Sequence, residues 1–233
     1  MPLKRWIDSA NNAIEGILTA AKTQRHIRYH LYAAFVVLMF SYIVGVTKTE
    51  FLVIALTTLF VIMAELVNTA IEVMVDILSP QLREEARIAK DVAAGAVLVT
   101  AFGAAIIGYI VLFPYMVGFF QKGFYVAVHP NDEIAVLALI VVMIAVVLLK
   151  AFFGKGLPLR GGMPSGHCAL SFSIWVSITV ITENIIVSVL SFIVALVIAQ
   201  SRVALKVHTP VEAFLGSLLG IFITYVLFVL FNS

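Results

Sequence analysis

The chain has 233 residues, of which 62% are hydrophobic and only 12% are charged, and its mean hydropathy is +1.10. A soluble domain cannot hide that much apolar surface, so the composition excludes a water-soluble globular protein and indicates one that crosses a membrane repeatedly. The net charge of +2 and the absence of basic runs give no sign of a nucleic-acid partner. The single cysteine, Cys168, excludes an internal disulfide and a cysteine-rich metal site.

Residues 3–27 mix charged and apolar side chains at helical spacing. Ile7, Ile14 and Leu18 share one face, and Lys4 and Glu15 fall mostly outside it. This pattern predicts an amphipathic helix on the membrane surface; a soluble helix that packs on its own protein is the alternative. The first residues do not lead directly into an apolar core, so a cleaved signal peptide is not expected.

Apolar runs follow, separated by turn residues. They cover residues 29–47, 51–78, 92–119, 134–153, 167–182, 185–200 and 210–230. Most reach the roughly 17–25 residues that a membrane crossing needs, and two are at the short end of that range. The predicted fold is therefore an all-α polytopic membrane protein with a surface helix and about seven transmembrane helices.

The basic residues indicate the orientation. With the amino terminus in the cytoplasm, seven crossings leave thirteen of the fifteen Lys and Arg residues on the cytoplasmic side, and only Lys48 and Lys122 outside. This distribution follows the positive-inside rule and places the carboxyl terminus outside. It also places two clusters of polar residues at the cytoplasmic edge.

The first cluster lies on the second and third predicted crossings. Glu65, Asn68, Glu72 and Asp76 recur at i, i+3, i+7 and i+11, which makes one stripe along a helix. Carboxylates inside an apolar helix are costly, so they must face protein, water or cations. Together with Lys90-Asp91 they suit a magnesium–nucleotide complex, although a cation or proton pathway would also string acids along a helix.

The stretches AELVNTAIEVMVD and AKDVAAGAV carry a resemblance to the prokaryotic diacylglycerol kinase/undecaprenol kinase family, over roughly residues 1–119. The resemblance implies that Glu65 is the catalytic base for a lipid hydroxyl, that ATP and Mg²⁺ are the cofactors, and that the chain is a homotrimer. It assigns ATP and metal binding to Asn68, Glu72, Asp76, Lys90 and Asp91.

One position departs from that family. Gln24 stands where the family has a glutamate that binds the metal together with the residue matching Glu72. An amide is a weaker ligand than a carboxylate for a hard divalent cation. The kinase half is accordingly either an active enzyme or an inactive trimerising scaffold.

The second cluster begins with Pro164-Ser165-Gly166-His167, directly before an apolar run. Ser165 is suited to cap the helix that begins there, and the free backbone N–H groups at its start attract anions. Arg202 supplies a guanidinium that grips two phosphate oxygens. Thr209-Pro210 predicts another helix start, with His208 and Glu212 four residues apart so that the carboxylate orients the imidazole.

These residues resemble the type 2 phosphatidic acid phosphatase superfamily, over roughly residues 133–233, through PSGH at 164–167 and SRVALKVH at 201–208. The resemblance implies that His208 is the nucleophile and forms a phosphohistidine, that His167 protonates the leaving lipid alkoxide, and that no metal takes part. It assigns phosphate binding to Ser165, Gly166, Arg202, Arg160 and a lysine, either Lys150 or Lys155.

This half also departs from its family. Glu212 replaces the usual aspartate, and Gly161 follows Arg160 where the family has proline. Neither lysine has the usual spacing; we favour Lys150 because the helix end places it at the membrane edge. The half has four predicted crossings where the family commonly has six.

The sequence therefore predicts a kinase-like domain over residues 1–119, with three crossings, and a phosphatase-like domain over 120–233, with four. The predicted function is a lipid phosphatase, acting on a lipid phosphate monoester or diphosphate, fused to an ATP-dependent kinase for diacylglycerol or undecaprenol. Both active sites would face the cytoplasm in a bacterial inner membrane, with membrane lipids as partners. A phosphatase on an inert scaffold and an ion or proton transporter remain the alternatives.

Overall fold

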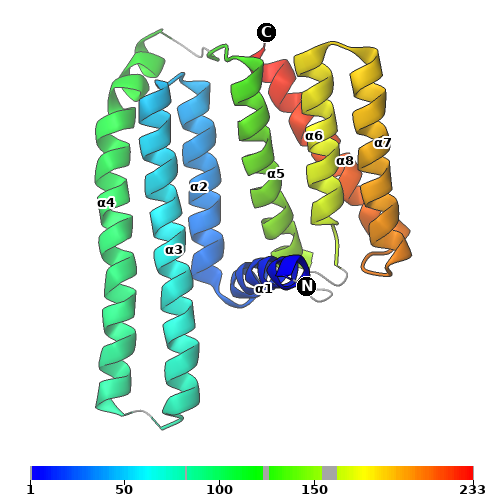
Figure 1. The fold of residues 1–233 in the computed structure, drawn as a ribbon. Coiled ribbons are helices and arrows are strands. Elements are labelled where there is room, and N and C mark those ends of the chain that lie inside the picture. Colours follow the sequence, from blue (N-terminus) through cyan, green and yellow to red (C-terminus); the bar gives the residue numbers. More distant parts are fainter. Residues whose placement is uncertain (1, 82, 123–125, 154–161, 233) are drawn as a thin grey trace. The chain divides into compact units, whose positions relative to one another are not determined.

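The computed structural model describes residues 2–81, 83–122, 126–153 and 162–232, and these residues form helices joined by short turns (Figure 1). The helices are α1 (Pro2–Thr23), α2 (Arg25–Ile43), α3 (Lys48–Leu78), α4 (Glu84–Lys122), α5 (Asn131–Phe153), α6 (Gly166–Thr182), α7 (Ile185–Ala204) and α8 (Pro210–Phe231). No strand occurs in the described ranges. The all-α fold predicted from the sequence is confirmed.

Five helices, α3, α4 as far as Phe119, α5, α7 and α8, are long and apolar enough to cross a membrane. The other two predicted crossings also form helices. At 17 residues, α6 spans only about 25 Å at roughly 1.5 Å per residue. The first two turns of α2 carry Arg25, His26, Arg28 and His30, which lower its hydropathy. The chain is a multi-pass membrane protein.

The predicted surface helix ends earlier than expected. Gln24 adopts an extended conformation, with φ −102° and ψ 117°, and separates α1 from α2. Residues 25–27, which the amphipathic pattern had included in the surface helix, therefore open α2. A single extended residue between two helices leaves no periodic signal in the sequence.

The helices form two compact units. The α5–α8 unit contains Met1–Thr23 and Val128–Ser233, and the α2–α4 unit contains Gln24–Ala127. The helix α1 thus packs in the α5–α8 unit, where Figure 1 draws it crosswise at the end of α5. The boundary between residues 119 and 120 proposed from the sequence stays a prediction.

In the α2–α4 unit, α3 packs against both α2 and α4. A capping box starts α3, because the Thr47 side chain accepts a hydrogen bond from the Glu50 backbone N–H, and the Glu50 carboxylate accepts one from Thr47 N. The Tyr115 hydroxyl on α4 donates to the same Glu50 carboxylate at 2.6 Å. These bonds hold α3 and α4 together at the end of the hairpin opposite the acidic stripe.

In the α5–α8 unit, α6 and α8 touch backbone to backbone. A Cβ atom on Gly216 would lie 2.3 Å from the Ser165 carbonyl oxygen, and one on Gly220 would lie 2.0 Å from that of Ala169. The two glycines form a Gly-x-x-x-Gly pattern, which lets membrane helices approach closely. Buried hydroxyls of Ser173 and Thr224 lie 2.7 Å apart across the same interface.

We expect Gly216→Ala to destabilise the α5–α8 unit, because its methyl group requires the backbone at Ser165 to move. Overpacking of this kind costs about 1–3 kcal/mol, or several degrees in the midpoint of thermal unfolding. Gly16→Ala is the matched control, since the added methyl group would meet no neighbouring atom within 4 Å. Equal unfolding temperatures of Gly216→Ala and wild type in detergent would refute this expectation.

Candidate active sites

The loop before α8 and the first turn of that helix are built by Thr209, Pro210 and Glu212. Pro210 occupies the first helical turn, and Thr209 caps the helix by accepting a hydrogen bond from Glu212 N. In return, Glu212 Oε2 accepts from Thr209 N at 3.1 Å. The predicted helix start is therefore observed, and its capping box holds the Glu212 carboxylate at the end of the helix.

His208 lies against that carboxylate. Its Nδ1 is 3.1 Å from Glu212 Oε2, and its side chain is only 1% exposed. The spacing predicted this pair on one helix face, but His208 lies one residue before the N-cap of α8, so the pair forms across the cap. With Nδ1 donating to the carboxylate, Nε2 carries the lone pair of the neutral ring.

Glu212 also joins this loop to the start of α6. Its Oε1 accepts a hydrogen bond from Gly162 N at 3.1 Å, and its backbone carbonyl accepts one from Ser165 N at 3.1 Å. Gly162 has a φ of +96°, which favours glycine. One residue therefore fixes both histidine-bearing segments.

Two buried polar atoms next to these segments have no hydrogen-bond partner in the described part of the chain, namely Ser165 Oγ and Arg202 Nε. Ser165 stands at the N-cap of α6 as predicted, but its hydroxyl makes no capping bond. The first N–H groups of α6, beginning at Gly166, point out of the helix start. Buried polar groups are normally satisfied, so these donors indicate an anionic ligand.

Further charges surround the same place. His167, in the first turn of α6, interacts electrostatically with Arg202, His208 and Lys150. Lys150 is buried in the last turn of α5, where it also interacts with Glu212. The other two phosphate-binding residues expected from the sequence, Lys155 and Arg160, lie outside the described residues.

His208 has an altered acidity. Burial holds the pKa of His208 below its ordinary value of 6.5, and the positive charges of Lys150 and Arg202 act in the same direction. The hydrogen bond to Glu212 opposes this shift without reversing it. The ring is therefore neutral at pH 7, with Nε2 able to accept a proton or attack an electrophile.

An apolar groove of about 490 Å³ lies between α7 and α8. At one end it is lined by Gln200, Val203 and Pro210, which are near neighbours in sequence of Arg202 and His208. It continues between α7 and α8 past Phe192, Phe214 and other side chains of the membrane interior. Neighbouring stretches of the chain thus carry the cationic cluster and line the apolar groove.

The acidic stripe runs along α3 from buried to exposed positions. Glu65 and Asn68 are buried, Glu72 is half-buried and Asp76 is exposed. Asn68 Nδ2 donates to Glu72 Oε1 at 3.0 Å, and Asn68 Oδ1 is buried without a partner among the described residues. The stripe therefore forms as predicted, with a paired amide and carboxylate at its centre.

At the exposed end of the stripe, Lys90 of α4 forms an ion pair with Asp76, and Arg87 Nη1 donates to Asp91 at 2.9 Å. These four residues line a cleft of about 450 Å³ between the ends of α3 and α4. Arg87 was not among the site residues predicted from the sequence. It lies one turn before Asp91, so an i, i+4 search for ion pairs identifies it.

Hard oxygen donors in this region fit a divalent cation that arrives with phosphate. In the described ranges, no three acidic or histidine side chains converge closely enough to hold an ion alone. A cation here would therefore complete its coordination with other oxygen ligands, such as water or the phosphate oxygens of ATP. The sequence predicted that Gln24 assists Glu72 in binding the metal. Gln24 adopts an extended conformation at the N-cap of α2, and its side chain makes no capping hydrogen bond.

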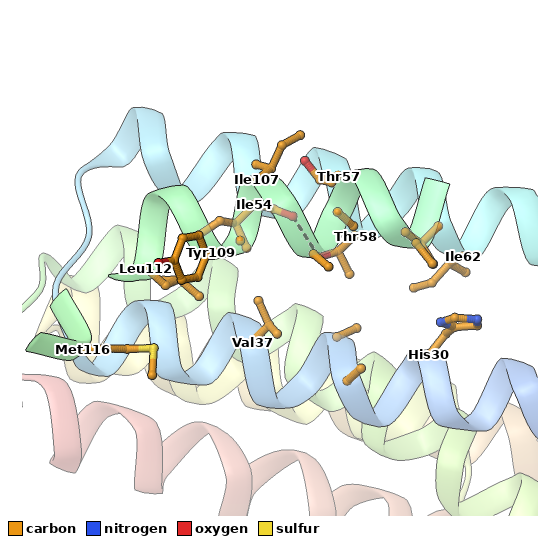
Figure 2. Close-up of a pocket in the computed structure, with 17 residues that line it drawn as sticks. His30, Val37, Ile54, Thr57, Thr58, Ile62, Ile107, Tyr109, Leu112 and Met116 are labelled. Atoms are coloured by element: carbon orange, nitrogen blue, oxygen red, sulfur yellow. Dashed lines mark hydrogen bonds between the residues drawn. The ribbon is translucent and has the colours of Figure 1, made fainter. Parts of the chain in front are cut away.

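A second apolar pocket, of about 390 Å³, lies among α2, α3 and α4 (Figure 2). Small side chains of α4, including Ala101, Ala104 and Gly108, leave this space open. Figure 2 shows His30 at the end of the pocket opposite Met116, with Thr58 bonded to the Ile54 carbonyl at 2.8 Å. The pocket is of a size and polarity for hydrocarbon.

Comparisons with known proteins agree with these two clusters. The sequence model of the family described as prokaryotic diacylglycerol kinase matches residues 11–112, and that of the PAP2 superfamily matches residues 154–233. An undecaprenol kinase of Bacillus subtilis is 38% identical over 112 residues, which are 48% of this chain and 91% of that protein. The chain joins a prokaryotic diacylglycerol kinase domain to a PAP2 domain. It is therefore an enzyme with lipid kinase and lipid phosphatase parts.

Other relatives belong to the kinase family as well. A diacylglycerol kinase of Synechocystis is 40% identical over 42% of this chain and 57% of its own length. A diacylglycerol kinase of Haemophilus influenzae is 27% identical over 42% of this chain and 82% of its own length. No solved structure is significantly similar to the chain.

The structure adds residues to the PAP2 site that motif reasoning missed. Gly162 donates its backbone N–H to Glu212, and Gly216 allows α8 to reach Ser165. The Gly216-x-x-x-Gly220 spacing is visible in the sequence as a helix-packing signal. The role of Gly162 leaves no such signal, because it depends on a contact fifty residues away.

The acidity of His208 predicts the pH dependence of the phosphatase. Whether the ring acts as nucleophile or base, it must be neutral, so protonation of His208 reduces activity below its lowered pKa. We expect the acid limb of kcat/KM below pH 6.5. Glu212→Gln removes two contributions that raise this pKa, so its acid limb should move to lower pH, and its plateau rate should fall about 100-fold or more.

The phosphate of the substrate also titrates, but its effect on the pH profile is the same for every variant assayed on one substrate. The acid limbs of the variants are therefore compared on a single substrate. Glu212→Asp keeps the negative charge and should retain an acid limb near that of wild type. An acid limb of Glu212→Gln at or above the wild-type pH would contradict the role assigned to the carboxylate.

Proposed function

We propose that the α5–α8 unit hydrolyses a lipid phosphate monoester or diphosphate through a phosphohistidine on His208. The observation that carries this proposal is the buried group of donors without a partner among the described residues, Ser165 Oγ and Arg202 Nε, beside a carboxylate-bound histidine. A phosphoryl group is tetrahedral and anionic, and it satisfies both donors and the free N–H groups of α6.

The first chemical step forms a bond from His208 Nε2 to phosphorus and breaks the bond from phosphorus to the lipid oxygen. His167 gives its proton to the departing alkoxide, so the lipid leaves as an alcohol or, from a diphosphate, as a monophosphate. Glu212 holds the Nδ1 proton and stabilises the charge that develops on the ring.

The second step regenerates the enzyme. Neutral His167 takes a proton from water, whose oxygen attacks phosphorus as the bond to His208 breaks, and inorganic phosphate is released. Arg202, Ser165 and Lys150 neutralise the equatorial oxygens in both steps. No metal ion takes part in the proposed steps.

The apolar groove between α7 and α8 suits the hydrocarbon tail of the substrate. A lipid whose phosphate lies at Arg202 has its tail beside Val203 and Pro210, where the groove begins. Burial of tail carbon atoms there gives binding energy of about 0.8 kcal/mol for each methylene group. The groove therefore supports a lipid as the substrate.

For the α2–α4 unit we propose ATP-dependent phosphorylation of a lipid alcohol, diacylglycerol or undecaprenol, as the names of its relatives suggest. Glu65 is the base that accepts the lipid hydroxyl proton. Asn68, Glu72, Asp76, Lys90 and Asp91 hold the nucleotide, with Glu72 and Gln24 near its Mg²⁺. The burial of Glu65 within α3 and the exposure of Asp76 at the cleft support this division of roles.

The arrangement in the cell follows from the same reasoning. We propose a homotrimer formed through the kinase part, in a bacterial inner membrane, with the amino terminus and both active sites in the cytoplasm and the carboxyl terminus outside. If the two parts interconverted the same lipid alcohol and lipid phosphate, the net reaction would be the hydrolysis of ATP alone. Their substrates therefore differ. Gln24 favours one other reading, in which the kinase part is an inert trimerising scaffold.

The phosphohistidine is tested by His208→Ala. We expect phosphate release from phosphatidic acid, phosphatidylglycerol phosphate and polyprenyl phosphates to fall by at least about 1,000-fold, with any kinase activity unchanged. Quenching wild type with SDS at alkaline pH during reaction with ³²P-labelled lipid should trap an acid-labile, base-stable protein phosphate, absent from the variant. Full phosphatase activity in His208→Ala would rule out this nucleophile.

The kinase part is tested by Gln24→Glu. A carboxylate binds Mg²⁺ better than an amide does, so we expect this variant to raise the rate of lipid phosphorylation from ATP and lower the Mg²⁺ concentration that it requires. Glu65→Gln in the same background should abolish transfer. Activity in Gln24→Glu alone would identify the natural protein as a scaffold, and no activity in either protein would reject kinase function.

A further inference from the structure

The turn after α7 joins two residues of the phosphatase site. Arg202 lies in the last turn of α7, and His208 lies in the loop between α7 and α8. The Arg202 carbonyl accepts hydrogen bonds from Val207 N at 3.1 Å and from His208 N at 3.2 Å. The backbone of the proposed nucleophile is thus bonded to the residue whose guanidinium is proposed to bind phosphate.

This turn has the hydrogen-bond pattern of a Schellman motif. Besides the bond from Val207 N to Arg202 O, Lys206 N donates to the Val203 carbonyl at 2.9 Å. The motif requires a left-handed backbone at the residue after the helix cap, and Lys206, which follows the C-cap Leu205, has a φ of +53°. Glycine is the usual residue there, because a Cβ atom disfavours positive φ. Lys206 therefore holds an unfavourable backbone conformation next to the site.

His208 is held at two points. The Glu212 carboxylate fixes the ring through Nδ1, and the Arg202 carbonyl fixes the main chain. Attack on phosphorus needs Nε2 of His208 in line with the phosphate bound at Arg202, and a misplacement of about 1 Å can cost about 100-fold in rate. The turn between these two residues sets their separation, so its conformation bears directly on catalysis.

The backbone of Lys206, rather than its charge, serves this purpose. The Lys206 side chain is exposed, whereas that of His208 is 1% exposed. The bonds that tie His208 to Arg202 are bonds between main-chain atoms. The position therefore requires a residue that tolerates positive φ, and it does not require a cation.

We propose that Lys206 is a positioning residue of the phosphatase, whose left-handed backbone closes the turn that aligns His208 with the phosphate at Arg202. The proposal rests on the phosphatase function assigned above to the α5–α8 unit. Valine at this position disfavours positive φ more strongly than lysine, because it is branched at Cβ. Glycine and asparagine adopt the left-handed conformation readily, and both lack the charge.

The test uses Lys206→Val, Lys206→Gly and Lys206→Asn in the full-length chain, with Glu183→Val as the matched control. Glu183 is the other non-glycine residue with positive φ in the described ranges, at 47°, and it is also exposed. It is the C-cap of α6, which begins at Gly166 beside the site and is about 25 Å long. Glu183→Val thus introduces the same strain far from His208.

We expect Lys206→Val to lower kcat for phosphate release from short-chain phosphatidic acid in detergent micelles about ten- to hundredfold. Its KM should stay within about threefold of wild type, because Arg202 remains in α7. Lys206→Gly, Lys206→Asn and Glu183→Val should keep kcat within about twofold. A wild-type kcat in Lys206→Val would overturn the proposal. Equal losses in Lys206→Val and Lys206→Gly would also overturn it, since they would assign the effect to the ammonium group.

Hydrogen exchange separates this inference from the catalytic one. Backbone amides in peptides covering residues 203–209 should exchange faster in Lys206→Val than in wild type or Lys206→Gly, with the rest of the α5–α8 unit unchanged. If this holds but wild type releases phosphate from no lipid, the phosphatase assignment fails and the role of Lys206 in holding His208 to Arg202 stands. If wild type hydrolyses lipid phosphate and this segment exchanges equally in all variants, Lys206 does not position His208.

Discussion

The PAP2 site depends on the hydrogen bonds of Glu212. The two carboxylate oxygens bind the His208 ring and the backbone N–H groups of Thr209 and Gly162, while the carbonyl of the same residue accepts from Ser165 N. A helix cap, the proposed nucleophile and the proposed phosphate-binding turn thus share one anchor. Loss of the carboxylate would free His208 to rotate and would leave the backbone N–H of the buried Gly162 unpaired, which is costly in a site of low dielectric.

This use of Glu212 also explains how a glutamate serves where the superfamily commonly has aspartate. The longer side chain reaches back past the N-cap to His208 while its other oxygen contacts Gly162. The capping box requires a residue of this length three positions after Thr209. The extra methylene group is therefore compatible with both the helix cap and the orientation of the imidazole.

Close helix packing is the second requirement of the site. Because Gly216 and Gly220 carry no side chain, α8 approaches the Ser165 and Ala169 carbonyls, and this approach brings Glu212 O to Ser165 N. In a membrane, no hydrophobic force drives helices together, so close van der Waals contact and bonds such as Ser173–Thr224 provide the association. The geometry of the catalytic residues is thus set by packing one and two turns further along the helix.

Much of this arrangement was predictable from the sequence, because the lengths of the apolar runs and caps such as Thr209-Pro210 indicate where helices lie. The stripe from Glu65 to Asp76 follows from helical periodicity alone. The position of α1 was not predictable in the same way, since its packing on α5 is a contact between segments more than one hundred residues apart. The same holds for Gly162, whose N–H finds Glu212 only in the folded chain, and for His208, which pairs with Glu212 from outside the helix.

The fusion places opposed reactions in one chain, and the chemistry of the two sites limits how they can coexist. A kinase makes lipid monophosphates, and the proposed PAP2 site would recognise a phosphoryl group through charges that do not contact the rest of the lipid. Discrimination between the kinase product and the phosphatase substrate must therefore come from what lies beyond the phosphate. The α7–α8 groove is lined by aromatic side chains such as Phe192 and Phe214, whereas the α2–α4 pocket contains small residues such as Ala101 and Gly108. The two cavities therefore offer different surfaces to the part of the lipid beyond the phosphate. Hydrocarbon chains that differ in bulk and branching bind to differently shaped surfaces with different free energies. Such selectivity would prevent the phosphatase from hydrolysing the product of the kinase.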